Sequence, residues 1–275
     1  MNIRLGYSDD VSASASDAPA EAPAASGGKD VEDAPSAKKL MAEKGLSPDQ
    51  VHQSGSQILL NNAYHLMLRP GDAMIADRGG VHEFMRWDGP ILTDSGGYQA
   101  FSMADINAID DEGVTFKSII DGAKVHLGPE RAMEVQNNLG ADIIMAFDDC
   151  PPSVAGLKGS DADPETHAAR LQVAVERTTQ WLHRCVQAHA RPDDQALFGI
   201  VQGGTDPALR ARSLAEITAV DLPGYAIGGV AVGESPERIH QIVAETAPQL
   251  PADRPRYLMG VGYERDIVQA VKSGV

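Results

Sequence analysis

The sequence predicts an α/β fold in which a parallel sheet curls as in a (β/α)8 TIM-type barrel. From about Leu40, short apolar runs alternate with helical segments, which is typical of parallel strands joined by helices. Five of these runs end in glycine or polar residues, and the carboxyl ends of barrel strands share the face that holds the active site. A doubly wound open sheet also alternates in this way, but its ligand contacts gather at a switch point instead of five successive strand ends.

The expected strands are short apolar runs, and they span residues 57–60, 90–93, 142–147, 196–201, 225–227 and 257–259. The expected helices span 129–139, 167–190, 207–219, 236–250 and 264–272. The first opens on proline and is closed by Gly140, and the last is closed by Gly274. Residues 114–120 and 124–127, joined through Asp121 and Gly122, predict a β-hairpin inserted between barrel elements.

The sequence divides into two parts. Residues 1–39 are rich in Ala, Ser and Asp and contain one aromatic residue, so they bury too little apolar area to offset the entropy of ordering, and we expect a disordered tail. Residues 40–275 form the predicted barrel. About six of eight strands are identified, and we therefore expect an incomplete barrel from a truncated chain.

Composition restricts the class of protein. The chain has 275 residues, of which 43% are hydrophobic, and no apolar run reaches the roughly 20 residues of a membrane span. Two cysteines exclude a disulfide framework, and Met1 to Tyr7 lacks an export-signal pattern, so we expect a cytoplasmic protein. The net charge of −16 disfavours nucleic-acid binding by bulk electrostatics, so any RNA contact must be local.

Two carboxylates stand at the ends of neighbouring predicted strands. Asp94 and Asp148 can converge on one pocket and divide acid, base and ligand-binding roles. Two other interpretations of the pair remain open: Asp94 caps a helix while Asp148 begins a loop, or the two serve a barrel glycosidase.

Glycine pairs and an amide complete the predicted pocket. Gly96-Gly97 and Gly228-Gly229 leave backbone amides accessible to a flat ligand, and Gln202 offers both a donor and an acceptor. A carboxylate, an amide and a backbone N–H together match the edge of a guanine-like base. Tyr98 can stack on such a ring, although a core tyrosine is an equal interpretation.

Seven stretches from about Leu40 to Val275 resemble the bacterial tRNA-guanine transglycosylases, also called queuine tRNA-ribosyltransferases. They are QILLNNAYHLMLRPG (57–71), WDGPILTDSGGYQ (87–99), EGVTFK (112–117), MAFDDC (145–150), FGIVQG (198–203), GYAIGGVAVGE (224–234) and YLMGVG (257–262).

The resemblance implies an enzyme of queuosine biosynthesis that exchanges guanine 34 of the tRNA anticodon for preQ1 by double displacement at the ribose. It implies Asp94 as the catalytic acid/base residue, and Asp148 as the ligand of N1 and the 2-amino group. Gln202 and the Gly229 amide would bind O6, the Val230 carbonyl would face the preQ1 aminomethyl group, and Cys150 with Val232 would favour preQ1 over queuine. The full predicted substrate-binding set is Asp94, Ser95, Gly96, Gly97, Tyr98, Asp148, Cys150, Gln202, Gly228, Gly229, Val230 and Met259.

The resemblance also implies partners and cofactors. A tRNA with a GUN anticodon would lie along Gly260, Val261, Gly262, Tyr263, Glu264, Arg265 and Asp266. A homodimer is expected, no redox or nucleotide cofactor is required, and no membrane is involved. Full-length relatives carry a structural zinc ion on three cysteines and one histidine, for which this chain has no counterparts.

The nucleophilic aspartate of the family follows the last helix of this chain, so we expect residues 1–275 alone not to exchange guanine. A catalytically silent relative that binds a purine base or partners a full-length subunit is the alternative. The sequence beyond residue 275 distinguishes the two.

Overall fold

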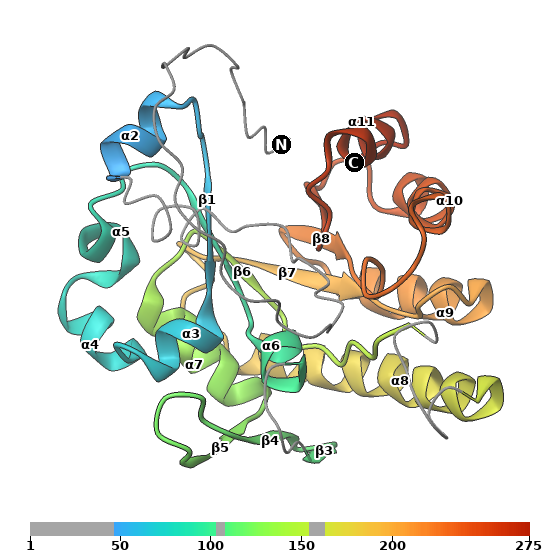
Figure 1. The fold of residues 1–275 in the computed structure, drawn as a ribbon, viewed down its shortest axis with the longest axis horizontal. Helices are drawn as coiled ribbons and strands as arrows, with labels where there is room; N and C mark the ends of the chain where they lie inside the picture. The colour runs from blue at the N-terminus through green and yellow to red at the C-terminus, as the bar shows by residue number, and fades with distance from the viewer. Residues whose placement is uncertain (1–46, 103–107, 154–162) are drawn as a thin grey trace, which may run out of the picture.

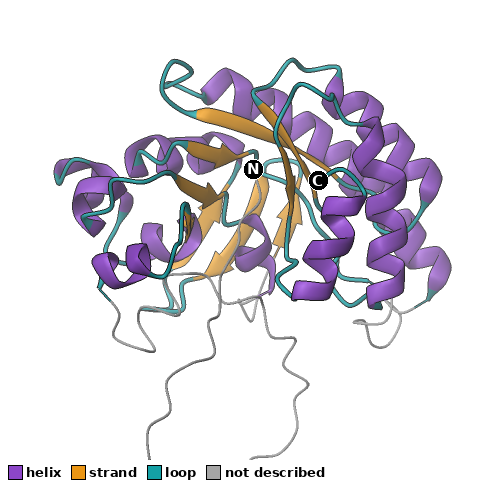
Figure 2. Ribbon diagram, turned by 90° about the horizontal axis from the view of Figure 1, so that it is seen from above, coloured by secondary structure: helices purple, strands orange, loops and turns teal. Residues whose placement is uncertain are grey.

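The structure, a computed structural model, describes residues 47–102, 108–153 and 163–275. In these ranges six parallel strands form one sheet in the order β1-β2-β6-β7-β8-β9 (Figure 1). The strands are β1 (Leu59–Asn62), β2 (Ile91–Asp94), β6 (Ile143–Met145), β7 (Ala196–Val201), β8 (Gly224–Ile227) and β9 (Arg256–Leu258). The sheet curls into a partial barrel, with the longer helices on its outer side (Figure 2). The predicted tail, residues 1–39, lies outside the described residues.

The longer helices follow the strands in alternation. They are α7 (Pro129–Leu139), α8 (Pro164–Ala188), α9 (Pro207–Thr218), α10 (Pro236–Thr246) and α11 (Glu264–Lys272). Four of them carry proline in the first turn, where a backbone N–H has no acceptor within the helix, so proline costs no hydrogen bond there. The predicted incomplete α/β barrel is confirmed.

Two apolar layers enclose the sheet. On β7, Leu197 and Val201 face the helices, whereas Phe198 and Ile200 face the inside of the curl with Met145. This division follows from the two-residue period of a strand. Burial on both faces also explains why the strands are continuous apolar runs.

Most predicted boundaries differ from the structure by one to four residues, and three of the differences have a clear local cause. Strand β6 ends at Met145 instead of residue 147, and the Phe147 N–H donates to the Cys185 thiol at 3.3 Å. Helix α8 begins earlier than predicted, at Pro164, because the Asp163 carboxylate caps it by accepting from the Thr166 N–H at 2.9 Å. Helix α10 ends at Thr246 and passes into a 3₁₀ turn, η3 (Ala247–Gln249), because the central residue of that turn, Pro248, cannot donate to an α-helical bond.

The predicted hairpin is part of a larger antiparallel sheet. Strands β4 (Gly113–Lys117) and β5 (Lys124–Leu127) pair as expected, and β3 (Ala108–Asp110) adds a third strand on the other side of β4. Strand β4 is shorter than predicted because the Ser118 hydroxyl accepts from the N–H groups of Ile120 and Asp121 and starts the turn there.

Five helices of six residues each were not predicted. They are α2 (Pro48–Gln53), α3 (Ala63–Leu68), α4 (Asp72–Asp77), α5 (Gly80–Met85) and α6 (Gly97–Ser102). Segments this short show less than two full helical turns of hydrophobic periodicity, so the pattern alone does not separate them from loops.

Candidate active site

The structure brings three of the predicted side chains together at the carboxyl end of the sheet. Asp94 is the last residue of β2, Asp148 lies three residues beyond β6, and Gln202 follows β7 directly. The Gln202 side-chain amide donates to Asp148 Oδ2 at 2.6 Å, and the charge on Asp94 contributes to the raised pKa of Asp148. These residues are therefore neighbours, although 54 positions separate Gln202 from Asp148 in the chain.

Burial changes the acidity of both carboxyl groups. It raises the pKa of Asp94 to about 7. It also raises the pKa of Asp148 to about 7, where the charges of Asp149 and Asp94 add to the rise and the Gln202 hydrogen bond opposes it. Burial and the charge on Asp94 raise the pKa of Tyr257 on β9. A carboxyl group with a pKa near 7 both accepts and releases a proton at neutral pH, as general acid and base catalysis requires.

Two acceptors in this cluster have no partner among the described residues. They are Asp94 Oδ1 and Gln202 Oε1, and both atoms are inaccessible to solvent. Buried polar atoms in folded proteins are nearly always hydrogen-bonded. Each of these oxygens thus lacks a hydrogen bond that a donor on a ligand would supply once the side chain turns toward it.

The glycine pair after β8 lies against Gln202. A Cβ on Gly228 would lie 3.1 Å from Gln202 Nε2 and 3.5 Å from Met259 Sδ, and one on Gly229 would collide with Gln202 Oε1. Gly229 also has a φ of +64°, which residues other than glycine rarely adopt. Burial raises the pKa of the neighbouring Cys150 thiol to about 12, and the Gln202 side chain and the Gly229 backbone oppose that rise. The turn packs this closely against Gln202 only because both positions are glycine.

The loop after β2 packs on the loop after β6. A Cβ on Gly97 would lie 3.1 Å from the Asp148 carbonyl oxygen, and one on Gly96, with φ +84°, would lie 2.8 Å from the Tyr64 nitrogen. Ser95 is buried, and its hydroxyl accepts from the Gly97 N–H at 3.4 Å. Tyr98 is half-buried in the first turn of α6. Its stacking role stays a prediction.

A buried ion cluster that the sequence analysis missed fixes the residue next to Asp148. The Asp149 carboxylate is 2% exposed and accepts from Arg177 at 2.7 Å and from both terminal nitrogens of Arg170. Its N–H donates to the Thr178 hydroxyl at 3.1 Å. The sequence alone does not show which of the two adjacent acids, Asp148 or Asp149, pairs with the arginines of α8, because either carboxylate can face that helix.

The segment expected to contact RNA is only partly available to a partner. Gly260 lies beside the turn after β8, because a Cβ there would be 3.3 Å from Ala231 Cβ. Tyr263 is 63% exposed, with the Arg265 guanidinium 5.6 Å from its ring centroid. Asp266, in contrast, is 5% exposed, and its Oδ1 lies 2.7 Å from His240 Nε2. The Asp266 carboxylate therefore joins α11 to α10 and does not face outward.

Among residues 47–102, 108–153 and 163–275, no three His, Cys, Asp or Glu side chains are grouped to hold a metal ion. Cys150 contacts Gln202, whereas Cys185 lies on α8 behind Phe147.

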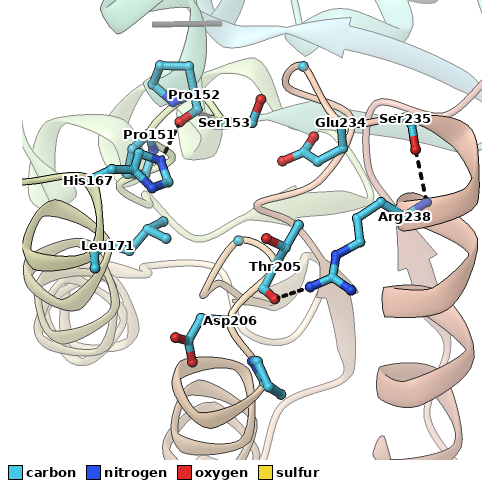
Figure 3. Close-up of a pocket in the computed structure, with 14 residues that line it drawn as sticks. Pro151, Pro152, Ser153, His167, Leu171, Thr205, Asp206, Glu234, Ser235 and Arg238 are labelled. Atoms are coloured by element: carbon cyan, nitrogen blue, oxygen red, sulfur yellow. Dashed lines mark hydrogen bonds between the residues drawn. The ribbon is translucent and has the colours of Figure 1, made fainter. Parts of the chain in front are cut away.

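A groove of about 550 Å³ lies next to the cluster but does not include it. Its walls continue the same three loops, through Pro151–Ser153 after Cys150, Gly204–Pro207 after Gln202 and Gly233–Ser235 after Gly229. Figure 3 shows His167 and Leu171 on one side and Glu234 and Arg238 on the other. None of the predicted substrate-binding residues lines it.

Comparisons with known proteins show which family the chain belongs to. The family model described as queuine tRNA-ribosyltransferase matches residues 37–275. The chain belongs to that family. The queuine tRNA-ribosyltransferase of Synechococcus elongatus is 52% identical over 236 residues, which are 86% of this chain and 59% of the relative. Those of Halalkalibacterium halodurans and Symbiobacterium thermophilum are 49% identical over 236 residues and 53% identical over 232 residues.

The alignments with these queuine tRNA-ribosyltransferases cover most of this chain but only part of each relative. The chain spans 59%, 59% and 55% of the length of these three relatives. No helix in the described ranges is long and apolar enough to span a membrane.

Proposed function

We propose that this chain carries the purine site of a tRNA-guanine transglycosylase, a pentosyltransferase that exchanges guanine 34 of a GUN anticodon for preQ1. The observation that supports this most is the 2.6 Å hydrogen bond between Gln202 and Asp148 beside Asp94 and the Gly229 N–H. The four groups come from four different strand ends and offer, side by side, the acceptors and donors that the guanine edge needs.

Each group has one role in the proposed site. The ionised Asp148 accepts from N1–H and the 2-amino group, while the Gly229 N–H and the Gln202 amide donate to O6. Binding then requires the Gln202 amide to turn from Asp148 toward the ligand. Tyr98 covers the ring, and the Val230 carbonyl accepts from the aminomethyl group of preQ1.

Asp94 is the proposed acid/base residue. Its pKa of about 7 lets it protonate the leaving guanine and take a proton from the incoming base at neutral pH. We assign the attack on C1′ of the ribose to no residue of this chain. The loop from Gly260 to Arg265 is the proposed tRNA contact, and a local contact of this kind is consistent with a net charge of −16.

Titration with a series of free bases tests the proposal. The site predicts that guanine binds more tightly than hypoxanthine, which lacks the 2-amino group, and that hypoxanthine binds more tightly than adenine, which lacks O6 and N1–H. Asp148→Asn should weaken guanine binding roughly 10- to 100-fold, because hydrogen bonds to a charged group contribute about 1.5–3 kcal/mol.

The exposed Asp193, in a turn before β7, provides the matched control. Asp193→Asn should leave all three affinities unchanged. Equal affinity for guanine and adenine, or an Asp148→Asn variant that binds guanine as the wild type does, contradicts the proposed site.

A further inference from the structure

A buried arginine lies directly behind the glycine turn of the proposed site. Arg210, on α9, is 5% exposed, and in the described part of the chain no carboxylate lies within ion-pair distance of it, although the charge of Glu234 acts on it from farther away. Buried charges are normally paired, because an uncompensated charge in a protein interior is costly. The position of Arg210 therefore requires an explanation.

Backbone carbonyl groups replace the missing counter-charge. Arg210 Nε donates to the Gly204 carbonyl at 2.8 Å, Nη1 lies 3.5 Å from the Val201 carbonyl, and Nη2 donates to the Gly228 carbonyl. Val201 and Gly204 stand on either side of Gln202, and Gly228 begins the turn after β8. One guanidinium thus joins the two loops that supply the donors of the proposed site.

The bond to the Gly228 carbonyl also fixes the direction of a donor. The Gly228 carbonyl and the Gly229 N–H belong to one peptide group, and in a trans peptide these two groups point in opposite directions. Among the described residues, the cis peptide bond is Arg69–Pro70, so this one is trans. Because Arg210 holds the carbonyl from behind, the Gly229 N–H faces forward, where it meets Cys150.

A glycine pair needs such a restraint more than other sequences do. Glycine lacks the Cβ that limits rotation of the adjoining peptide group, so the Gly228–Gly229 peptide is free to turn over at little steric cost. Arg210 Nη2 would be 3.2 Å from a Cβ on Gly229, so the guanidinium itself packs against the turn.

We propose that Arg210 is a positioning residue that directs the Gly229 N–H toward the O6 oxygen of the bound purine. The inference rests on the proposed function, since it assigns that N–H to O6. A hydrogen bond from a cation to the carbonyl also polarises the peptide group and makes its N–H a stronger donor. Arg210 touches no ligand and acts only through the Gly228–Gly229 peptide.

Guanine and 2-aminopurine test the proposal when the loss of affinity on substitution is measured for each base separately. Guanine has O6 and N1–H, whereas 2-aminopurine has neither and keeps only the 2-amino group that Asp148 binds, so the weaker binding that its N1 causes is present in wild type and variant alike. Arg210→Met should lower guanine affinity roughly 3- to 10-fold, the size expected for one neutral hydrogen bond, and change 2-aminopurine affinity less than about twofold. Arg210→Lys, which keeps the charge, should recover part of the loss. The fluorescence of 2-aminopurine reports its binding directly.

Arg212 on the same helix is the matched control. It is 40% exposed and pairs with Glu216 at 2.7 Å, so Arg212→Met should leave both affinities unchanged. Equal losses for both bases in Arg210→Met would show a merely structural role and overturn the inference. Failure of the wild type to bind guanine would instead contradict the proposed function.

A measurement on the wild-type chain covers the case in which the variants do not fold. In a ¹³C-labelled sample, the carbonyl resonance of Gly228 should lie downfield of the carbonyl resonances of other glycines that follow strands, because the Arg210 cation donates a hydrogen bond to the Gly228 carbonyl oxygen. A resonance at the position of a solvent-exposed glycine carbonyl would overturn the inference.

Discussion

Replacing Asp148 by asparagine should stabilise the chain at neutral pH and not at acid pH. The pKa of Asp148 is raised from 3.8 to about 7, so between these values the folded state binds a proton that the unfolded state has lost. The free energy of unfolding of the wild type therefore falls as the pH rises through this window, and the loss is complete above pH 7. Asparagine retains an oxygen that can accept from Gln202 and carries no charge.

The magnitude follows from the size of the shift. About three pKa units at 1.36 kcal/mol each give an upper limit of about 4 kcal/mol in favour of Asp148→Asn at pH 8, decreasing toward zero near pH 4. Urea unfolding of both proteins at half-unit intervals from pH 4 to pH 8.5 measures this difference. Because the two proteins differ at one position, the contributions of groups that do not interact with Asp148 cancel, whereas Asp94, whose charge raises the pKa of Asp148, contributes to the difference.

The control for this series is Asp193→Asn, for which the difference should stay within about 0.5 kcal/mol at every pH, as is usual for a surface substitution. A pH-independent difference between Asp148→Asn and the wild type would refute the reasoning. So would a wild type that gains stability, relative to the variant, as the pH rises.

Two further substitutions test the geometry of the site. Gly229→Ala should abolish measurable guanine binding because its Cβ collides with Gln202. Gly122 has a similar φ of +73° and open space around it, so Gly122→Ala should leave guanine binding intact and lower the free energy of unfolding only by the roughly 1–2 kcal/mol of a left-handed residue. Calorimetric titration measures the binding and thermal melts measure the stability, and retained binding in Gly229→Ala would contradict the assigned geometry. Asp149→Ala should cost about 3–5 kcal/mol of unfolding free energy, since it removes the buried carboxylate that pairs with Arg170 and Arg177 and leaves Arg177 only the exposed Asp111. Asp221→Ala, which breaks an exposed ion pair with Arg254, should cost less than about 1 kcal/mol. Similar losses in the two would contradict the assigned burial.

The sequence predicted the sheet and the placement of the site because both depend on strong local signals. Buried strands appear as apolar runs, and the residues directly after them, such as Asp94, Gln202 and Gly228, necessarily lie at one end of a parallel sheet. The confirmed parts of the fold are those set by this rule. Strand and helix ends were less accurate, because side-chain caps such as Asp163 and turns such as that at Ser118 decide them.

Other features depend on contacts between distant segments and were not predicted. Asp149 is distinguished from Asp148 only by the arginines that reach it from α8. The sequence around Arg210 does carry a signal of its burial. It lies four and seven residues before Leu214 and Ile217, which places it on the buried stripe of α9, whereas Arg212 falls on the exposed side. An arginine on an apolar stripe is a candidate for a buried structural or positioning role.

The most direct test is a crystal structure of this chain with guanine bound. The base should lie with its N1 and 2-amino edge at the Asp148 carboxylate, its O6 within hydrogen-bond distance of the Gly229 nitrogen, and the Gln202 amide turned away from Asp148. Guanine found in the groove between His167 and Arg238, or no base at the strand ends under saturating conditions, would contradict the proposed purine site.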